Sequence, residues 1–170
     1  MMYNALRHAS HTGFSLIEVL VALFVLSIGL LGLAALQTTG LKFNHQSYER
    51  TQAVLQAYDI IDRMRANKSG SGSTINTTYS NVTLGAVPGT TDCATATVPP
   101  GCTGDQLAQY DIRKWNTANA ALLANGKGAI CKGSFSTDLS SCDTTGSVYR
   151  IAITWKESDL DMRFDVETQL

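Results

Sequence analysis

The chain is 170 residues long, which is enough for one long helix and one modest globular domain but not for two full domains. It carries 13 Lys and Arg residues against 14 Asp and Glu residues, with no block of basic residues, which argues against a dedicated nucleic-acid-binding surface. Leu and Val are concentrated in the first third of the chain, whereas the rest is rich in Thr, Ser, Ala, Asn and Gly. We therefore expect a membrane segment joined to a polar head.

Residues 14–36 form a predominantly apolar run that contains a single acidic residue, Glu18. At about 1.5 Å per residue, a helix of this length would span the hydrocarbon core of a bilayer, which is about 30 Å thick. An ionised side chain within such a segment costs about 2.5–3.5 kcal/mol on insertion scales. We therefore predict that Glu18 is a functional residue with a specific partner.

The N-terminus differs from a removable secretory signal, because no small-x-small cleavage site follows the apolar run. Instead, Gly13 precedes the run, so the apolar segment would survive cleavage at that point. Arg7 and the amino terminus are expected on the cytoplasmic side, which by the positive-inside rule places the C-terminal bulk across the membrane. The prediction is a single-pass protein with its head on the far side.

The helical pattern continues beyond the apolar run, so one helix is predicted for residues 14–66, about 80 Å long if unbroken. Its first part, residues 14–36, is the transmembrane half, and residues 37–66 form an amphipathic half. The predicted apolar face of the second half consists of Leu41, Tyr48, Val54, Leu55, Tyr58, Ile61 and Met64. The predicted polar face consists of Glu49, Arg50, Gln52, Gln56, Asp59, Asp62 and Arg63. Turn-forming residues 67–73 end the helix.

The middle of the chain has little periodicity, and residues 74–104 are expected to form a long loop that contains the three prolines. A second helix is predicted for residues 105–125, because apolar side chains recur at helical spacing and Asn125 with Gly126 closes it. Tyr110 and Trp115 lie on the apolar face of this helix, and we expect both to pack in the core.

Strand patterns occur late in the chain, first as a short candidate at residues 128–135. Two alternating runs follow, at residues 147–156 and 162–170, and residues 157–161 are expected to form the loop between them. The inward side chains are predicted to be Tyr149, Ile151, Ile153, Trp155, Met162, Phe164, Val166 and Leu170. The outward ones are predicted to be Arg150, Thr154, Lys156, Arg163, Asp165 and Glu167. The predicted head, residues 67–170, is thus a small antiparallel sheet with a late hairpin at residues 147–170, covered by the amphipathic half of the long helix, in an α+β fold.

All four cysteines, Cys93, Cys102, Cys131 and Cys142, lie in the part of the chain predicted to be translocated. An even number of cysteines outside the cytoplasm indicates two disulfides, for which three connectivities are possible. We favour the local pairs, Cys93 with Cys102 and Cys131 with Cys142, because each closes a short loop. The spacing lacks the paired C-x-x-C of a zinc site and no histidine is near, so neither a metal nor another cofactor is expected.

The sequence contains none of three common catalytic or nucleotide-binding motifs: there is no G-x-S-x-G, no H-E-x-x-H and no phosphate-binding glycine loop. His8 and His11 lie in the N-terminal segment ahead of Gly13, and His45 stands alone on the predicted helix. Asp159 and Asp161 have a spacing that calcium ligands can adopt, but in a hairpin loop they more simply indicate a solvated turn. We expect a protein that is not an enzyme.

The segment Gly13-Phe-Ser-Leu-Ile-Glu18-Val-Leu-Val-Ala22 resembles the class III signal of type IV pilins and pseudopilins. The resemblance implies the type IV pilin fold, with residues 1–13 as a prepilin leader. It also implies that a membrane prepilin peptidase cleaves between Gly13 and Phe14 and methylates the new amino group of Phe14. In that family, the N-terminus of a neighbouring subunit is thought to meet the glutamate, here Glu18.

Cleavage after Gly13 would create a charged amine on Phe14, one helical turn from Glu18. That amine, from the same or an adjacent chain, is the nearest candidate to neutralise the carboxylate. Because an unpaired buried charge is costly, such pairing would favour axial registry of the helices as subunits leave the lipid. Gly29 and Gly32 would permit close helix packing in a filament core. The simpler alternative is a signal anchor that contains a stray acidic residue.

Residues 26–37 and 57–67, together with the strand Tyr149 to Trp155, resemble the minor pilins of the type IV pilus modification protein PilV family. That resemblance implies a subunit held in the inner membrane with its head in the periplasm, and then incorporated into a pilus at the cell surface. Its implied partners are the prepilin peptidase, other minor and major pilins, the inner-membrane assembly platform and the lipid bilayer. The implied function is priming or modifying pilus assembly, and through the pilus supporting motility, adhesion or DNA uptake.

Two rival functions remain open from the sequence. A pseudopilin of a type II secretion system would share the N-terminal signal and differ in its partners. A membrane-anchored periplasmic binding module would keep its leader. Loss of Arg7 with the leader would make the mature chain slightly more acidic, so direct binding of nucleic acid is not expected.

Overall fold

The computed structural model describes residues 13–69, 74–95 and 101–170. Most of the predicted leader, including Arg7, His8 and His11, lies outside the described residues, as do Pro99 and Pro100. The helices are α1 (Leu16–Ala66), the 3-10 helix η1 (Thr77–Ser80) and α2 (Gly104–Leu122). The strands are β1 (Lys68–Ser69), β2 (Thr74–Ile75), β3 (Asn81–Val82), β4 (Lys127–Lys132), β5 (Val148–Glu157) and β6 (Leu160–Gln169).

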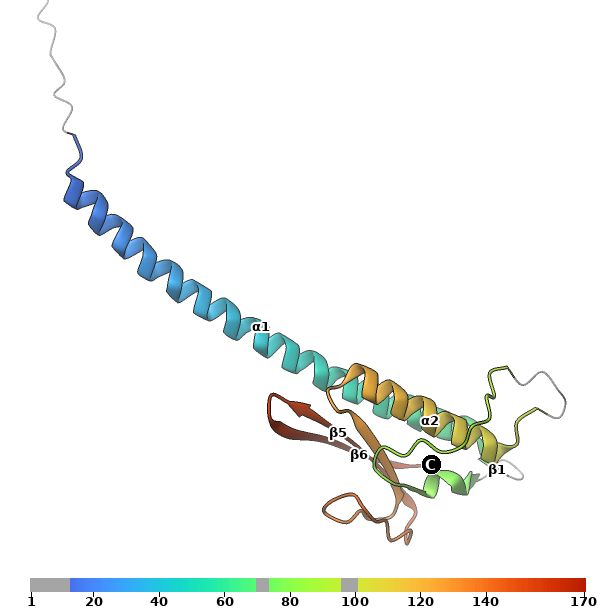
Figure 1. Ribbon diagram of the computed structural model, residues 1–170. Helices are drawn as coiled ribbons and strands as arrows, with labels where there is room; N and C mark the ends of the chain where they lie inside the picture. The colour runs from blue at the N-terminus through green and yellow to red at the C-terminus, as the bar shows by residue number, and fades with distance from the viewer. Residues whose placement is uncertain (1–12, 70–73, 96–100) are drawn as a thin grey trace, which may run out of the picture. The chain divides into compact units, whose positions relative to one another are not determined.

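The chain forms two compact units that divide between Asn44 and His45, within α1. The second unit, His45–Leu170, contains the remainder of α1 together with α2 and the strands, drawn from cyan to red in Figure 1. A long N-terminal helix followed by a small antiparallel sheet confirms the predicted α+β pilin-type fold. The part of α1 from His45 onward therefore lies in the same compact unit as the sheet.

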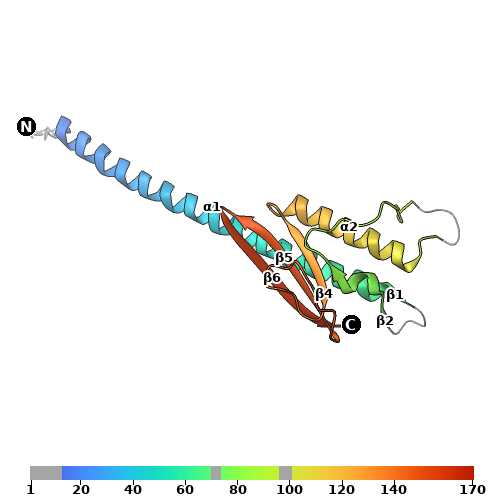
Figure 2. The same ribbon diagram turned by 60° about the horizontal axis from the view of Figure 1, so that its bottom comes forward.

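The main sheet has the strand order β3-β4-β5-β6, with every neighbouring pair antiparallel. The long hairpin of β5 and β6 is visible in Figure 2. Its connection is shorter than predicted, because Glu157 pairs with Leu160 and leaves a two-residue turn at Ser158 and Asp159. Ser158 has φ 50°, the left-handed conformation that tight hairpin turns require. The prediction of a loop at residues 157–161 was therefore wrong.

The region predicted as a long loop, residues 74–104, contains three short elements in its described part. β2 pairs with β1, and β3 pairs with β4 through Asn81 opposite Cys131 and Val82 opposite Ile130. Between them, the side chain of Asn76 caps η1 by accepting a hydrogen bond from the Thr78 N–H at 2.9 Å. Strands of two residues are too short to produce a visible alternation, which explains why the sequence pattern missed them.

The buried face of α1 includes the predicted Ile61 and Met64 but otherwise differs from the predicted one. It consists of Glu49, Ala53, Ala57, Ile60, Ile61 and Met64. Leu55 and Tyr58, both predicted to be buried, are 55% and 53% exposed, and Leu41 and Tyr48 are exposed as well. The small side chains of Ala53 and Ala57 allow neighbouring elements to approach closely, so the packed face is the one with alanines.

Helix α2 lies beside α1, as the two views of Figures 1 and 2 agree. The indole N–H of Trp115, which is fully buried as predicted, donates to the backbone carbonyl of Gln56 at 2.8 Å. Tyr110 is only partly buried and lies outside the core, with Arg113 and Lys114 each 5.5 Å from its ring centroid. The core thus lies between the second half of α1, α2 and the sheet.

Two further features position α2. Thr103 and Gln106 form a capping box, in which the Thr103 hydroxyl accepts from the Gln106 N–H at 3.2 Å and the Gln106 side chain accepts from the Thr103 N–H at 2.9 Å. The side chain of Asn116 accepts from the Gly128 N–H of β4 at 2.7 Å. The close approach of Gly128 to the Trp115 ring is possible because glycine has no Cβ.

We predict that Gly128→Ala destabilises the head, because an added Cβ would lie 2.2 Å from Cη2 of the buried Trp115 ring. Overpacking of this kind typically costs about 1–3 kcal/mol. The control is Gly146→Ala, since the nearest atom to its Cβ is 3.4 Å away. Thermal unfolding of the full chain in detergent micelles measures both variants. Equal melting temperatures for the two variants would contradict the packing described here.

Candidate assembly site

The N-terminal candidate residues surround the start of α1. Gly13 and Phe14 precede the helix, and the Phe14 side chain is 85% exposed. The Ser15 carbonyl accepts hydrogen bonds from the N–H groups of Glu18 at 3.0 Å and Val19 at 3.3 Å, which forms the first turn. Glu18 is therefore held at a defined position one turn from Phe14, with an exposed side chain.

The carboxylate of Glu18 has no hydrogen bond or ion pair within the described part of the chain. An acidic residue in the first turn interacts favourably with the helix dipole, but this contributes only about 0.3–1 kcal/mol. The cost of an ionised side chain in a membrane segment is larger, about 2.5–3.5 kcal/mol. The helix alone therefore does not compensate this charge in lipid.

The surface around Glu18 is apolar and uncovered. Among the described residues, α1 is the one helix long and apolar enough to cross a membrane. No residue of its most apolar stretch is buried. Added Cβ atoms at Gly29 and Gly32 would meet no atom of the chain within 4 Å. This part of α1 presents an unoccupied apolar surface that lipid or other helices could cover.

A polar cluster in the head joins three elements. Arg63 of α1 contacts Asp59 through Nε at 2.9 Å and Asp111 of α2 through Nη1 at 3.2 Å. The Tyr79 hydroxyl of η1 donates to the other Asp111 oxygen at 2.7 Å. Asn67 donates to the Tyr79 hydroxyl at 3.4 Å and to the Gly104 carbonyl at 2.7 Å. We call these residues, Asp59, Arg63, Asn67, Tyr79 and Asp111, the Arg63 cluster.

The environment of the Arg63 cluster changes two pKa values. Burial raises the pKa of Tyr79 well above its ordinary value, because the ionised phenolate is poorly solvated and lies beside the Asp111 carboxylate. Burial acts to lower the pKa of Arg63, but the hydrogen bonds and charges of Asp59 and Asp111 raise it overall. The buried Asp111 carboxylate thus faces a permanent cation and a neutral phenol. The sequence analysis missed this arrangement, because Tyr79 and Asp111 are brought together only by the tertiary fold.

The four cysteines form the two local disulfides that the sequence analysis favoured, Cys93 with Cys102 and Cys131 with Cys142. The second disulfide joins β4 to the segment that follows it. Asp143 lies close enough to this pair to resemble a metal site, with ligand atoms within 4.8 Å of one another. Sulfurs joined in a disulfide offer no thiolate, so this group lacks the ligands that a soft metal prefers.

The structure contradicts the predicted exposure of Glu49. This residue, expected on the polar face of α1, is 6% exposed, and its Oε1 lies 3.7 Å from Nδ1 of His45. Its Oε2 has no hydrogen-bond partner in the described part of the chain. The sequence pattern placed Glu49 with its polar neighbours, but Glu49 lies on the same helix face as Ala53 and Ala57, at four-residue spacing, and that face is buried.

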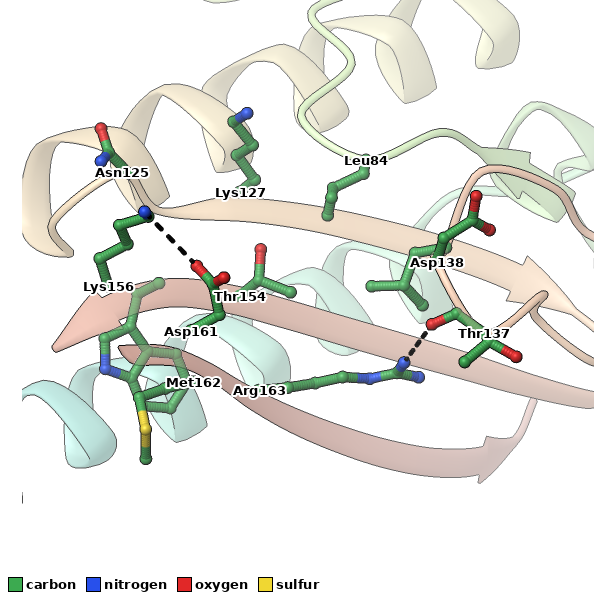
Figure 3. A pocket seen from close by; sticks show the side chains of 12 residues that line it. Leu84, Asn125, Lys127, Thr137, Asp138, Thr154, Lys156, Asp161, Met162 and Arg163 are labelled. Carbon is green, nitrogen blue, oxygen red and sulfur yellow. Dashed lines mark hydrogen bonds and ion pairs between the residues drawn. The ribbon is translucent and has the colours of Figure 1, made fainter. Parts of the chain in front are cut away.

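A hollow of about 750 Å³ lies on the outer face of the sheet, beside the β5–β6 turn (Figure 3). Lys156 Nζ lies 3.9 Å from Asp161 Oδ1, and Arg163 donates to the Thr137 carbonyl at 3.4 Å. Asp161 therefore lies in β6 facing Lys156, and does not form a turn site with Asp159. The residues that line the hollow include no pairing of a nucleophile with a histidine base, which hydrolytic catalysis typically needs.

Comparison with known protein families gives two matches. Residues 9–34 match the model of the prokaryotic N-terminal methylation motif. Residues 35–113 match the model of the Tt1218-like family, described as type IV pilin Tt1218. The first match contains Gly13, Phe14 and Glu18, and the second contains the whole Arg63 cluster. No curated protein and no solved structure matches the chain.

We predict that Tyr79→Phe lowers the free energy of unfolding by about 0.5–1.5 kcal/mol near neutral pH, because Asp111 loses a hydrogen bond. The difference should shrink as the pH rises above about 10. There the unfolded wild-type tyrosine ionises, whereas the folded one stays protonated, so wild-type stability falls. Unfolding curves between pH 7 and 11 measure this, with the exposed Tyr58→Phe as control. A pH-independent difference would show that burial does not raise this pKa.

Proposed function

Because the chain belongs to the type IV pilin family, we propose that it is a minor pilin of the PilV type that primes or modifies pilus assembly. The observation that carries this proposal is the uncompensated Glu18 carboxylate at the start of α1, in a helix whose most apolar stretch is entirely uncovered. Such a helix is poorly suited to remain alone in lipid, and it is well suited to pack among other helices whose charges complement its own.

The first step is processing at the N-terminal signal. A prepilin signal implies processing by a prepilin peptidase and assembly with other pilins. We propose that cleavage falls between Gly13 and Phe14 and that the new amino group on Phe14 is methylated. Gly13 and Phe14 precede the first helical turn and are exposed, so the bond lies outside regular secondary structure, where a peptidase can reach it.

The second step is registry between subunits. In the proposed filament, the Phe14 amine of one subunit lies beside the Glu18 carboxylate of another, so that both charges leave the lipid as a pair. An unpaired charge in this environment is costly, and therefore a helix that is misplaced axially is disfavoured. Glu18 thus acts in assembly and has no role in catalysis.

The surfaces needed for packing are present on α1. Gly29 and Gly32 leave room for a neighbouring helix to approach closely. Close packing of this kind can hold apolar helices together in lipid, where there is no large hydrophobic driving force between them. The exposed Tyr48, Leu55 and Tyr58 continue an apolar surface along the second half of α1. We propose that these side chains contact neighbouring subunits next to the membrane-derived core of the filament.

The assignment to the minor pilins, and to the PilV type, rests on the resemblance of residues 26–37, residues 57–67 and the strand around Tyr149 to Trp155. We propose that the chain is first held in the inner membrane as a single-pass protein with a periplasmic head, and then enters the pilus near its tip. Its proposed partners are other minor and major pilins and the inner-membrane assembly platform. Through the pilus, the protein would support motility, adhesion or DNA uptake.

The second candidate function is that of a pseudopilin in a type II secretion system, because the signal and the membrane helix are common to both classes. A membrane-anchored binding module is the third, and it would retain residues 1–13. The hollow beside the β5–β6 turn is its best candidate ligand site. Three basic side chains line it, Lys127, Lys156 and Arg163, and of these Lys156 and Arg163 already have partners.

The test is complementation of a strain from which the gene has been deleted, with pili counted in a background that cannot retract them. We expect the deletion to reduce the number of pili, the wild-type gene to restore it, and Glu18→Ala to be cleaved normally but to fail to restore it. Ser27→Ala is the matched control, because it removes a polar side chain from the same helix whose hydroxyl bonds only the Leu23 carbonyl.

Normal piliation with Glu18→Ala would overturn the registry role. Normal piliation in the deletion strain combined with a loss of protein secretion would instead assign the chain to a secretion system.

A further inference from the structure

The sheet ends in a long strand whose outer side is unpaired. β6 is ten residues long and is the last strand in the order β3-β4-β5-β6. Figure 2 shows it at the edge of the sheet, on the opposite side of β5 from β4. Edge strands are usually protected by short length, proline, bulges or inward-pointing charges. β6 contains neither proline nor glycine, and its inward residues Met162, Phe164 and Val166 are apolar. Of the common devices that prevent another strand from pairing, the edge has only its charged outward side chains, so a strand of complementary charge can still add to it.

The register of the hairpin identifies the unpaired backbone groups. Glu157 and Leu160 flank the two-residue turn and form a hydrogen-bonded pair, and such pairs alternate along an antiparallel ladder. Two hydrogen bonds of β5 agree with this register. The Lys156 N–H faces away from β6 and donates to the Ala124 carbonyl at 2.8 Å, and the Val148 carbonyl faces away from β6 and accepts from the Gly133 N–H at 2.9 Å. In β6, the outward-facing backbone groups are those of Asp161, Arg163, Asp165, Glu167 and Gln169. Within the described residues, these groups have no hydrogen-bond partner.

The side chains of β6 indicate what kind of strand would fit. On the inner face, Met162, Phe164 and Val166 are only partly buried against the core, and Leu160 is 69% exposed. An incoming strand would cover these side chains with its own apolar residues. On the outer face, the edge row has three carboxylates, Asp161, Asp165 and Glu167, against one guanidinium, Arg163. Arg163 pairs with Asp165 within the row, whereas Asp161 and Glu167 pair with Lys156 and Arg150 of β5, one strand further from the edge.

A second copy of this chain is a poor partner for the edge of β6. Two paired β6 edges would bring together six carboxylates and two guanidiniums, and like charges that face each other destabilise a strand pair. We propose that the free edge of β6 binds an extended segment of a different polypeptide, in which basic residues alternate with apolar ones, as an added fifth strand. β6 lies outside both segments that match family models, and the proposal does not depend on cleavage at Gly13.

The first test uses the full chain in detergent micelles and a fluorescein-labelled ten-residue peptide of alternating lysine and valine, blocked at both ends. We expect saturable binding by fluorescence polarisation. A peptide with glutamate in place of lysine should bind at least about tenfold more weakly, because it adds to the charge of the edge. Absence of saturable binding, or equal affinity for both peptides, would overturn the proposal. Self-association of the protein through β6 without peptide would overturn the choice of partner.

The second test distinguishes pairing at the edge from general attraction of a basic peptide. Asp165→Pro removes an outward N–H without removing a bond to β5, and proline is tolerated where the N–H faces solvent. Asp165→Thr is the matched control, since it loses the same carboxylate and keeps the N–H. We expect the proline variant to bind about tenfold more weakly than the threonine variant. Equal affinities would contradict strand addition.

Amide hydrogen exchange of the wild-type chain provides a readout that does not require a stable variant. Peptide binding should slow exchange at the outward amides of Asp161, Arg163, Asp165 and Glu167, and should change the intervening amides little because β5 already protects them. A uniform change along β6, or no change, would contradict the proposed mode of binding.

Discussion

The proposed role of the chain depends on one constraint, which is the uncompensated carboxylate of Glu18 in the first turn of a helix that begins with an apolar stretch. The helix dipole compensates only part of the cost of that charge in lipid, and no described residue of the chain pairs with it. The chain is therefore incomplete as an isolated membrane protein. The proposed function resolves this in a simple physical way, because cleavage ahead of Phe14 would create the missing cation and assembly would bring it to a neighbouring subunit.

The head is built to hold the second half of α1 firmly while the first half stays uncovered. Ala53 and Ala57 let the helix pack closely, and Trp115 ties α2 to the Gln56 carbonyl. The Arg63 cluster adds a polar connection among α1, α2 and η1, in which each charged or hydroxyl group has a partner.

Much of this was predictable from local pattern, and the failures have physical causes. The long helix, α2 and the late hairpin follow from periodicity. The predicted inward side chains of β5 and β6 are confirmed, including Met162, Phe164 and Val166 of the edge strand. The buried face of α1 was misassigned because large apolar residues such as Leu55 and Tyr58 dominate a periodic pattern, whereas alanines decide close packing. Glu49 was misplaced for the same reason. The Arg63 cluster joins residues up to 52 positions apart (59 to 111), and no local pattern reports such contacts.

The central claim is that Glu18 acquires its partner only after the chain is cut. The most direct measurement is the intact mass and N-terminal sequence of the protein purified from its own host. The account predicts a chain that begins at Phe14, lacks residues 1–13 and carries one methyl group on its amino terminus. A chain that still begins at Met1, with an unmodified N-terminus, would contradict it.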